Sequence, residues 1–138
     1  MATVQDLIPQ RYPFQLLDRL IDVTPGVQAQ AEKLVTINEW FFQSETLTGR
    51  TMLRPLLLEI LAQTGVAALL SMPDNQGKNV FFGGIQQATF QASVQPGDRL
   101  QTMVTLTKLK HRIGMGHGVI RCEGQVVVTA DLIFVIQP

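Results

Sequence analysis

Residues 56–72 most strongly constrain the fold, because they form a helical stretch that is apolar on every face. Its apolar residues occupy positions all around a helix rather than one stripe: Leu56, Leu57, Leu58, Ile60, Leu61, Val66, Ala67, Leu69 and Leu70. A helix without a polar face has to be covered on all sides. Pro55 suits the start of a helix and Pro73 follows its last turn. We therefore expect a central helix enclosed by other structure.

The length of this stretch approaches the lower limit for a membrane-spanning helix. It carries Glu59 and Gln63, however, and a proline bounds it on each side. We interpret it as a core helix and expect no membrane partner.

The N-terminal residues include Asp6 and Arg11 without a continuous apolar run, which is unlike a secretory signal. The single cysteine, Cys122, permits no intrachain disulfide, which suits a cytoplasmic protein.

A series of predicted strands follows the helix. Four segments are rich in Val, Ile, Thr and Phe, and the turn or bulge signals Pro96-Gly97-Asp98, Gly114 and Glu123-Gly124 separate them: 80–90, 99–110, 113–122 and 126–136. Successive strands with short connections form an antiparallel sheet. Before the helix, 27–37 is predicted as a strand, 22–26 as a turn and 38–53 as a long loop.

The pattern predicts an α+β fold in which an antiparallel sheet curls around a long central helix. With 138 residues, of which 46% are hydrophobic, residues 1–138 are expected to form a single domain. One sheet cannot cover every face of a helix, so we expect a second subunit to complete the cover, as a homodimer or a larger homo-oligomer. Eleven basic and eleven acidic residues cancel, whereas nucleic-acid binding normally needs a basic surplus, so we expect no nucleic-acid partner.

Five segments match the motifs of one family, in the same order and with similar spacing. Residues 8–14 with 17–19 are similar to PHRYPFLLVDR, 35–39 with 41–43 to VTINEPFFQ, 58–63 to IEALAQ, 84–90 to GIDKARF and 94–98 to VxPGD. On these motifs, which extend nearly end to end, the chain resembles the 3-hydroxyacyl-acyl-carrier-protein dehydratases.

The resemblance implies a hot-dog fold and a dimeric or larger assembly. It also implies a lyase of fatty-acid biosynthesis that works without a metal or an organic cofactor. The substrate would be a 3-hydroxyacyl thioester, carried on acyl carrier protein or coenzyme A, from which water is removed. The family uses two catalytic residues from different subunits: a histidine in FFQGHFPGRP and a glutamate on the central helix.

Glu59 matches the catalytic glutamate of the family. It is the only ionisable residue of the helix. A protonated carboxyl in apolar surroundings is suited to donate a proton to a leaving hydroxyl. The alternative is a structural glutamate that bonds to Gln63, one turn further along, or to a loop amide. The family match favours the catalytic interpretation.

The catalytic histidine of the family has no counterpart. An ungapped count places Glu45 at its position, whereas alignment on the following Gly-Arg pair places Thr46 there. The two histidines, His111 and His117, lie far away in the strand region. A general base contributes about 10²- to 10⁴-fold to a rate, so we expect dehydration to be weak or lost. The alternative is an acid–base pair of Glu45 and Glu59.

The start of the helix also departs from the family. The family has MPGV, whose glycine amide can bond the thioester oxygen, whereas residues 52–55 read MLRP. Arg54 keeps a backbone N–H at the positive end of the helix, but Pro55 has none. Arg54, which adjoins the helix, and Gln63 and Phe42, which lie in matched motifs, are the candidate substrate-binding residues. Arg54 would alternatively be a solvated surface residue.

One cationic cluster is a candidate docking surface for an acidic carrier protein. Lys108, Lys110 and Arg112 share one face at strand spacing, with His111 between them. A solvated strand face is the alternative.

Two classes of function follow. The chain is either an enzyme, namely a divergent dehydratase or a hot-dog thioesterase, or a non-catalytic protein that binds acyl chains, carrier protein or a partner subunit. In the second case a paralogous subunit would supply the missing histidine.

Overall fold

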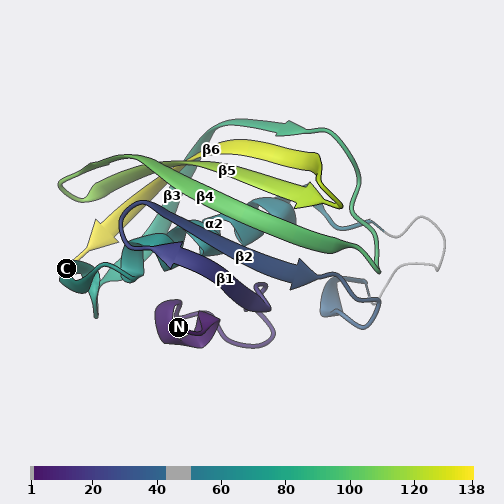
Figure 1. Ribbon diagram of the computed structural model, residues 1–138, viewed down its shortest axis with the longest axis horizontal. Helices are drawn as coiled ribbons and strands as arrows, with labels where there is room; N and C mark the ends of the chain where they lie inside the picture. The colour runs from purple at the N-terminus through teal and green to yellow at the C-terminus, as the bar shows by residue number, and fades with distance from the viewer. Residues whose placement is uncertain (1, 43–50) are drawn as a thin grey trace.

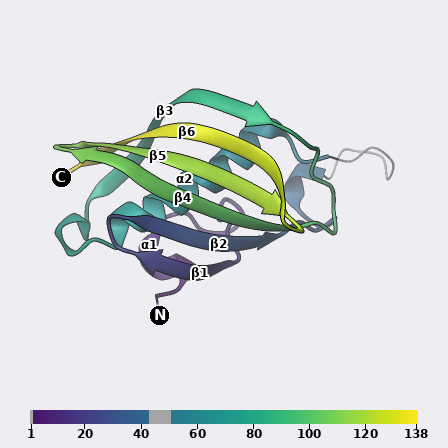
Figure 2. The ribbon, with the colours of Figure 1, turned by 45° about the horizontal axis from the view of Figure 1, so that its top comes forward.

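The computed structural model describes residues 2–42 and 51–138, and a curved antiparallel sheet dominates it (Figure 1). The elements in chain order are α1 (Val4–Leu7), β1 (Arg19–Thr24), β2 (Gln28–Leu34), the 3-10 helix η1 (Trp40–Phe42), α2 (Arg54–Leu70), the 3-10 helix η2 (Pro73–Asn75), β3 (Asn79–Phe90), β4 (Arg99–Lys110), β5 (Ile113–Cys122) and β6 (Gln125–Gln137). The six strands follow the order β1-β2-β4-β5-β6-β3. The sheet curls around α2, which lies against its concave face (Figures 1 and 2).

The predicted central helix is confirmed, shifted by two residues at each end. Pro55 lies in the first turn of α2, and the side-chain amide of Asn75 donates a hydrogen bond of 2.9 Å to the carbonyl oxygen of Leu69 near its end. Every residue from 60 to 69 is buried. Within the described ranges, no helix has the length and hydropathy needed to span a membrane.

The sheet supplies only part of the cover of α2. The chain's own N-terminal segment supplies more, because Ile8, Leu16 and Leu17 are buried. The backbone of this segment also bonds to the fully buried side chain of Gln63 on α2. A second subunit is therefore not required to bury the C-terminal half of the helix. Nearer its start, Leu56, Leu58 and other residues remain partly exposed.

Two other sequence expectations were wrong. Residues 19–24 form β1, so the turn expected at 22–26 is confined to 25–27. A register shift between Leu20 and Asp22 leaves Ile21 exposed and removes the alternation that marks a strand. Gly114, expected as a turn signal, lies inside β5, and the turn is formed instead by residues 111–112.

Gly65 permits α2 to lie close to the sheet. A Cβ atom at this position would lie 2.3 Å from Cζ of the buried Phe134. Gly65→Ala is therefore expected to lower the free energy of unfolding by about 1–3 kcal/mol, the usual cost of overpacking a core. Gly114→Ala is the control, because its Cβ would meet Leu69 at an ordinary 3.4 Å. Urea denaturation of both variants checks this, and equal losses of stability would contradict it.

Candidate functional site

Glu59 lies in the second turn of α2 and is half-buried. Its Oε1 atom accepts a hydrogen bond of 3.1 Å from Nε2 of Gln63, one turn further along the helix. This is the contact that the structural interpretation of Glu59 anticipated. It leaves the Oε2 atom of Glu59 without a protein donor among the described residues. Among the described residues, the carboxyl group is thus held from one side only.

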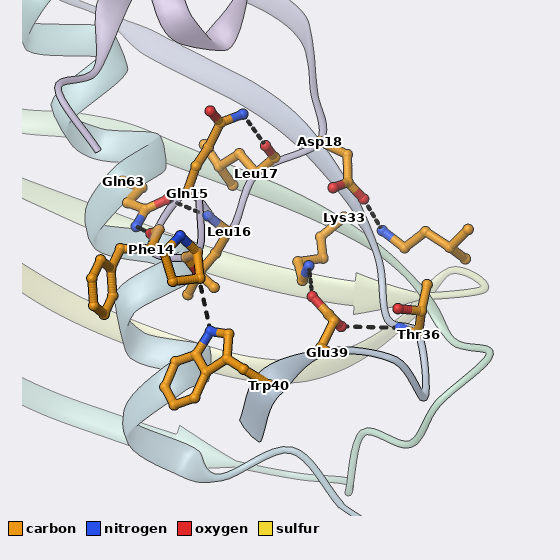
Figure 3. A network of polar contacts seen from close by, with 12 residues as sticks. Phe14, Gln15, Leu16, Leu17, Asp18, Lys33, Thr36, Glu39, Trp40 and Gln63 are labelled. Carbon is orange, nitrogen blue, oxygen red and sulfur yellow. Dashed lines mark hydrogen bonds and ion pairs between the residues drawn. The ribbon is translucent and has the colours of Figure 1, made fainter. Parts of the chain in front are cut away.

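Gln63 connects α2 to the N-terminal segment. Its Nε2 also donates to the carbonyl oxygen of Phe14 at 2.8 Å, and its Oε1 accepts from the amide of Leu16 at 2.9 Å. Figure 3 shows this network beside α2. All the hydrogen-bonding groups of the side-chain amide are engaged in holding the N-terminal segment and Glu59. These contacts favour a role for Gln63 in orienting Glu59.

The segment before residue 43 is anchored by polar contacts to β2 and to the N-terminal segment (Figure 3). Glu39 forms an ion pair with the buried Lys33, and it also accepts a 3.0 Å hydrogen bond from the amide of Thr36. The indole N–H of Trp40 donates to the carbonyl oxygen of Pro13 at 3.0 Å. Phe42, a candidate substrate-binding residue, is fully buried. These contacts fix the chain up to Phe42.

Glu45 and Thr46 lie outside the described residues. The proposed pairing of Glu45 with Glu59 and the identity of any base in that segment therefore remain predictions.

A cavity of about 290 Å³ lies at the start of α2 and extends to the end of β3. Its lining includes Arg54, Leu57, Phe90 and Ser93. The guanidinium carbon of Arg54 lies 4.7 Å from the centre of the Phe90 ring, so a cation–π contact holds this exposed side chain against the end of β3. Arg54 therefore covers part of this cavity.

Neither histidine is placed near Glu59. His117 is on the outer face of β5, with its Nδ1 atom 2.8 Å from Oδ1 of Asp131. The adjacent Gly118 faces Leu61 of α2, so the side chain of His117 points away from the helix. His111 is in the turn between β4 and β5, three residues before Gly114, which faces Leu69. Leu69 is ten residues beyond Glu59, or about 15 Å along the helix axis.

Cys122 is also poorly suited to chemistry. Burial, together with the carboxylates of Asp98 and Glu123, raises the pKa of its thiol. A raised pKa lowers the fraction of thiolate, which is the nucleophilic form. The interpretation of Cys122 as an ordinary strand residue agrees with its half-buried place in β5.

The cationic cluster lies on the β4–β5 hairpin. Lys108 pairs in register with Met115, and Lys110 with Ile113, on the outer face of the sheet. Together with His111 these residues line a cavity of about 330 Å³. Arg112 is in the turn itself, so only the two lysines share a strand face as expected. The result is an apolar floor with lysines at its edge.

Comparisons with known proteins show that the chain is similar to dehydratases. The model of the FabA-like domain family matches residues 8–131. A 3-hydroxyacyl-acyl-carrier-protein dehydratase FabZ of Roseiflexus castenholzii is 46% identical over 137 residues, covering 97% of this chain and 96% of the relative. The FabZ dehydratase of Ligilactobacillus salivarius is 42% identical over 136 residues, covering 99% and 97%.

Solved structures support the same fold. The dehydratase heterocomplex ApeI:P from Xenorhabdus doucetiae superposes with a TM-score of 0.81 at 20% identity, covering 100% of this chain and 92% of that chain. The uncharacterized protein PH1136 from Pyrococcus horikoshii superposes with a TM-score of 0.73 at 13% identity, covering 98% and 94%. The expected hot-dog fold is confirmed.

Proposed function

The chain belongs to the family of FabA-like domains and 3-hydroxyacyl-acyl-carrier-protein dehydratases, and from this membership we propose that it binds 3-hydroxyacyl thioesters but dehydrates them weakly or not at all by itself. The observation that supports this proposal is that Glu59 matches the family's helix glutamate, whereas residues 43–50 contain no histidine. Gln63 holds Glu59 in place. The side chain of His117 points away from α2, and His111 is in the turn between β4 and β5. The protein would act in the cytoplasm, in fatty-acid biosynthesis, without a cofactor.

The proposed chemistry needs two groups. A base removes a proton beside the thioester carbonyl, and an acid protonates the departing hydroxyl, so that water leaves and a double bond forms. Glu59 is the candidate acid, because one of its carboxyl oxygens is free of protein donors among the described residues. The base is the group in doubt.

A dehydration assay on the purified protein tests this proposal directly. The substrate is a 3-hydroxyacyl thioester of acyl carrier protein, and the FabZ relative from Roseiflexus castenholzii is the positive control. Turnover is expected to be lower than that of the control by about 10²-fold or more, the lower range for loss of a general base. Comparable turnover would refute the proposal and favour the Glu45/Glu59 pair. Release of a free thiol would instead identify a thioesterase.

We further propose that the β4–β5 hairpin docks the carrier protein. The lysine-edged cavity described above matches an acidic partner in charge and offers apolar contact through Ile113 and Met115. Replacing Lys108 and Lys110 together by Gln is expected to weaken carrier-protein binding by about 10-fold at an ionic strength of about 0.15 M, because such charges accelerate association. Isothermal titration measures this effect.

The matched control removes two positive charges from the same face of the sheet, at the end of β4 and β5 that lies away from the hairpin turn. Arg99→Gln with Arg121→Gln does so, and carrier-protein binding is expected to stay within about twofold of the unmodified chain, because the salt-screened field of these charges is short-ranged. Equal weakening by both pairs would show that only net charge matters, which would exclude the hairpin as the docking surface. Binding of the coenzyme A thioester with equal affinity would exclude carrier docking as the source of substrate recognition.

The assembly is proposed to form along β3. In the part of the chain that the structure describes, no strand pairs with the outer edge of β3, and this 12-residue strand exposes Phe81, Phe82 and Ile85. A long, apolar sheet edge is a template for pairing with another strand. Sedimentation equilibrium at a mass near twice 15.3 kDa would support a homodimer, and a monomer would contradict it.

A second candidate function is that of a partner subunit for a complete dehydratase. The structural neighbour ApeI:P is named as a dehydratase heterocomplex, and this chain retains Glu59 without the histidine. In such a complex the partner would supply the base. Coexpression of this chain with a complete dehydratase, each carrying its own tag, followed by copurification, tests this candidate first.

A further inference from the structure

A row of polar side chains crosses four strands on the outer face of the sheet. Arg19 of β1, Glu32 of β2, Gln101 of β4 and Arg121 of β5 are successive cross-strand partners. Adjacent strands are about 4.8 Å apart, so the two arginines start about 14 Å from each other. Arg99 lies on the same face, two residues before Gln101 on β4. We call this the arginine groove; it encloses about 500 Å³.

The groove carries more positive charge than its own carboxylate neutralises. Three arginines and one glutamate line it, which gives a net charge of three minus one, or +2. The Oε2 atom of Glu32 is 2.6 Å from Nη2 of Arg19, and its Oε1 atom is 3.2 Å from Nη1 of Arg99. Both carboxyl oxygens are therefore engaged. Arg121 forms no ion pair with any residue that the structure describes.

The guanidinium groups of the groove retain free donors. Each arginine has five N–H groups, and the Glu32 carboxylate occupies few of them. Arg19 and Arg99 are largely exposed, and ion pairs of exposed groups contribute little to stability, so both can turn to a ligand at small cost. The next carboxylate on this face, Asp22, pairs in register with Gln30 and does not line the groove.

We propose that the arginine groove binds a phosphorylated small molecule through its phosphate group. A phosphate dianion matches the +2 charge of the lining, and planar guanidinium groups match phosphate oxygens in bidentate geometry. Gln30 and Gln101 add amide groups, while Ile21 and Met103 add apolar surface for the rest of the ligand. Thr102, between Gln101 and Met103 on β4, bonds to Thr64 of α2, so its two neighbours face away from the helix. Binding in the groove is therefore separate from the proposed thioester chemistry.

Isothermal titration at constant ionic strength tests the proposal, with inorganic phosphate in one arm and adenosine monophosphate in the other. Saturable binding of the unmodified protein is expected in both arms if free phosphate is the ligand. Tighter binding of the monoester would identify an organic phosphate. Arg99→Gln with Arg121→Gln is expected to weaken binding by about 10- to 100-fold, the loss of one or more charge-assisted contacts.

The control is the hairpin variant with Gln at Lys108 and Lys110, which should retain phosphate affinity within about twofold, since its charges are at the far end of β4. Absence of saturable binding to the unmodified protein, or equal weakening in both double variants, would overturn the proposal.

Amide resonances provide a second measurement that needs no variant. Phosphate should shift the NMR resonances of the side-chain amides of Gln30 and Gln101. Chemical-shift changes confined to other regions would overturn the site.

Discussion

Glu45→His combined with Arg54→Gly and Pro55→Val is expected to raise dehydration by at least about 10²-fold over the unmodified chain. Glu45→His supplies a side chain whose reference pKa of about 6.5 suits a base near neutral pH. Arg54→Gly removes the side chain that the Phe90 ring holds over the cavity at the start of α2. Pro55→Val restores a backbone N–H in the first turn, where this group would donate a hydrogen bond to the thioester oxygen.

The three substitutions are expected to act together rather than additively. A base cannot act on a thioester that the Arg54 side chain keeps out, and an open cavity without a base gives no reaction. Single-turnover assays of Glu45→His alone, of the Arg54→Gly/Pro55→Val pair and of the triple variant separate these effects. A triple variant that folds as a dimer and binds acyl carrier protein, yet does not dehydrate, would contradict the inherited site and favour a structural role for Glu59.

Local patterns predicted the core of the fold. The apolar helix and the four strands after it were visible because each has its own period and its own turn residues. β1 was missed because a register shift at Ile21 breaks its alternation, so no period-2 signal exists in the sequence. The cover of α2 by the N-terminal segment was also missed. It depends on bonds between Gln63 and residues 47 to 49 positions earlier, which no local pattern encodes.

For the side-chain clusters too, contacts between residues close in sequence were foreseen and contacts between distant strands were not. The bond between Glu59 and Gln63 was foreseen as the structural alternative for Glu59, because one helical turn separates the two residues. The two lysines of the hairpin were foreseen as neighbours on one strand face. The arginine groove was not, because it joins side chains from four strands whose register is a property of the whole sheet. Residue spacing alone cannot bring Arg19 and Arg121 together.

Glu59 is expected to rescue a dehydratase that has lost its own helix glutamate. The proposed partner is the FabZ relative from Roseiflexus castenholzii carrying Gln in place of the glutamate that aligns with Glu59. Alone, this partner is expected to lose about 10²- to 10⁴-fold in turnover, because an amide cannot donate the proton. Coexpressed with the present chain carrying Arg54→Gly and Pro55→Val, it gains a subunit with an open cavity at the start of α2 and a carboxyl at that position. If the family's shared site forms, one of the two sites in the mixed dimer has both groups.

Purified mixed dimer is therefore expected to recover up to about half of the turnover of the unmodified relative, since one of its two sites is complete. The same mixture made with Glu59→Gln should stay at the level of the deficient partner, which is a loss of about 10²-fold or more. Glu123→Gln, which changes an exposed carboxylate in the turn after β5, is the matched control and should leave the recovery intact. Recovery that persists in the Glu59→Gln mixture would show that the carboxyl is not the proton donor. A mixed dimer that forms without any recovery would show that this chain does not complete a shared site, and would leave acyl or carrier-protein binding as its function.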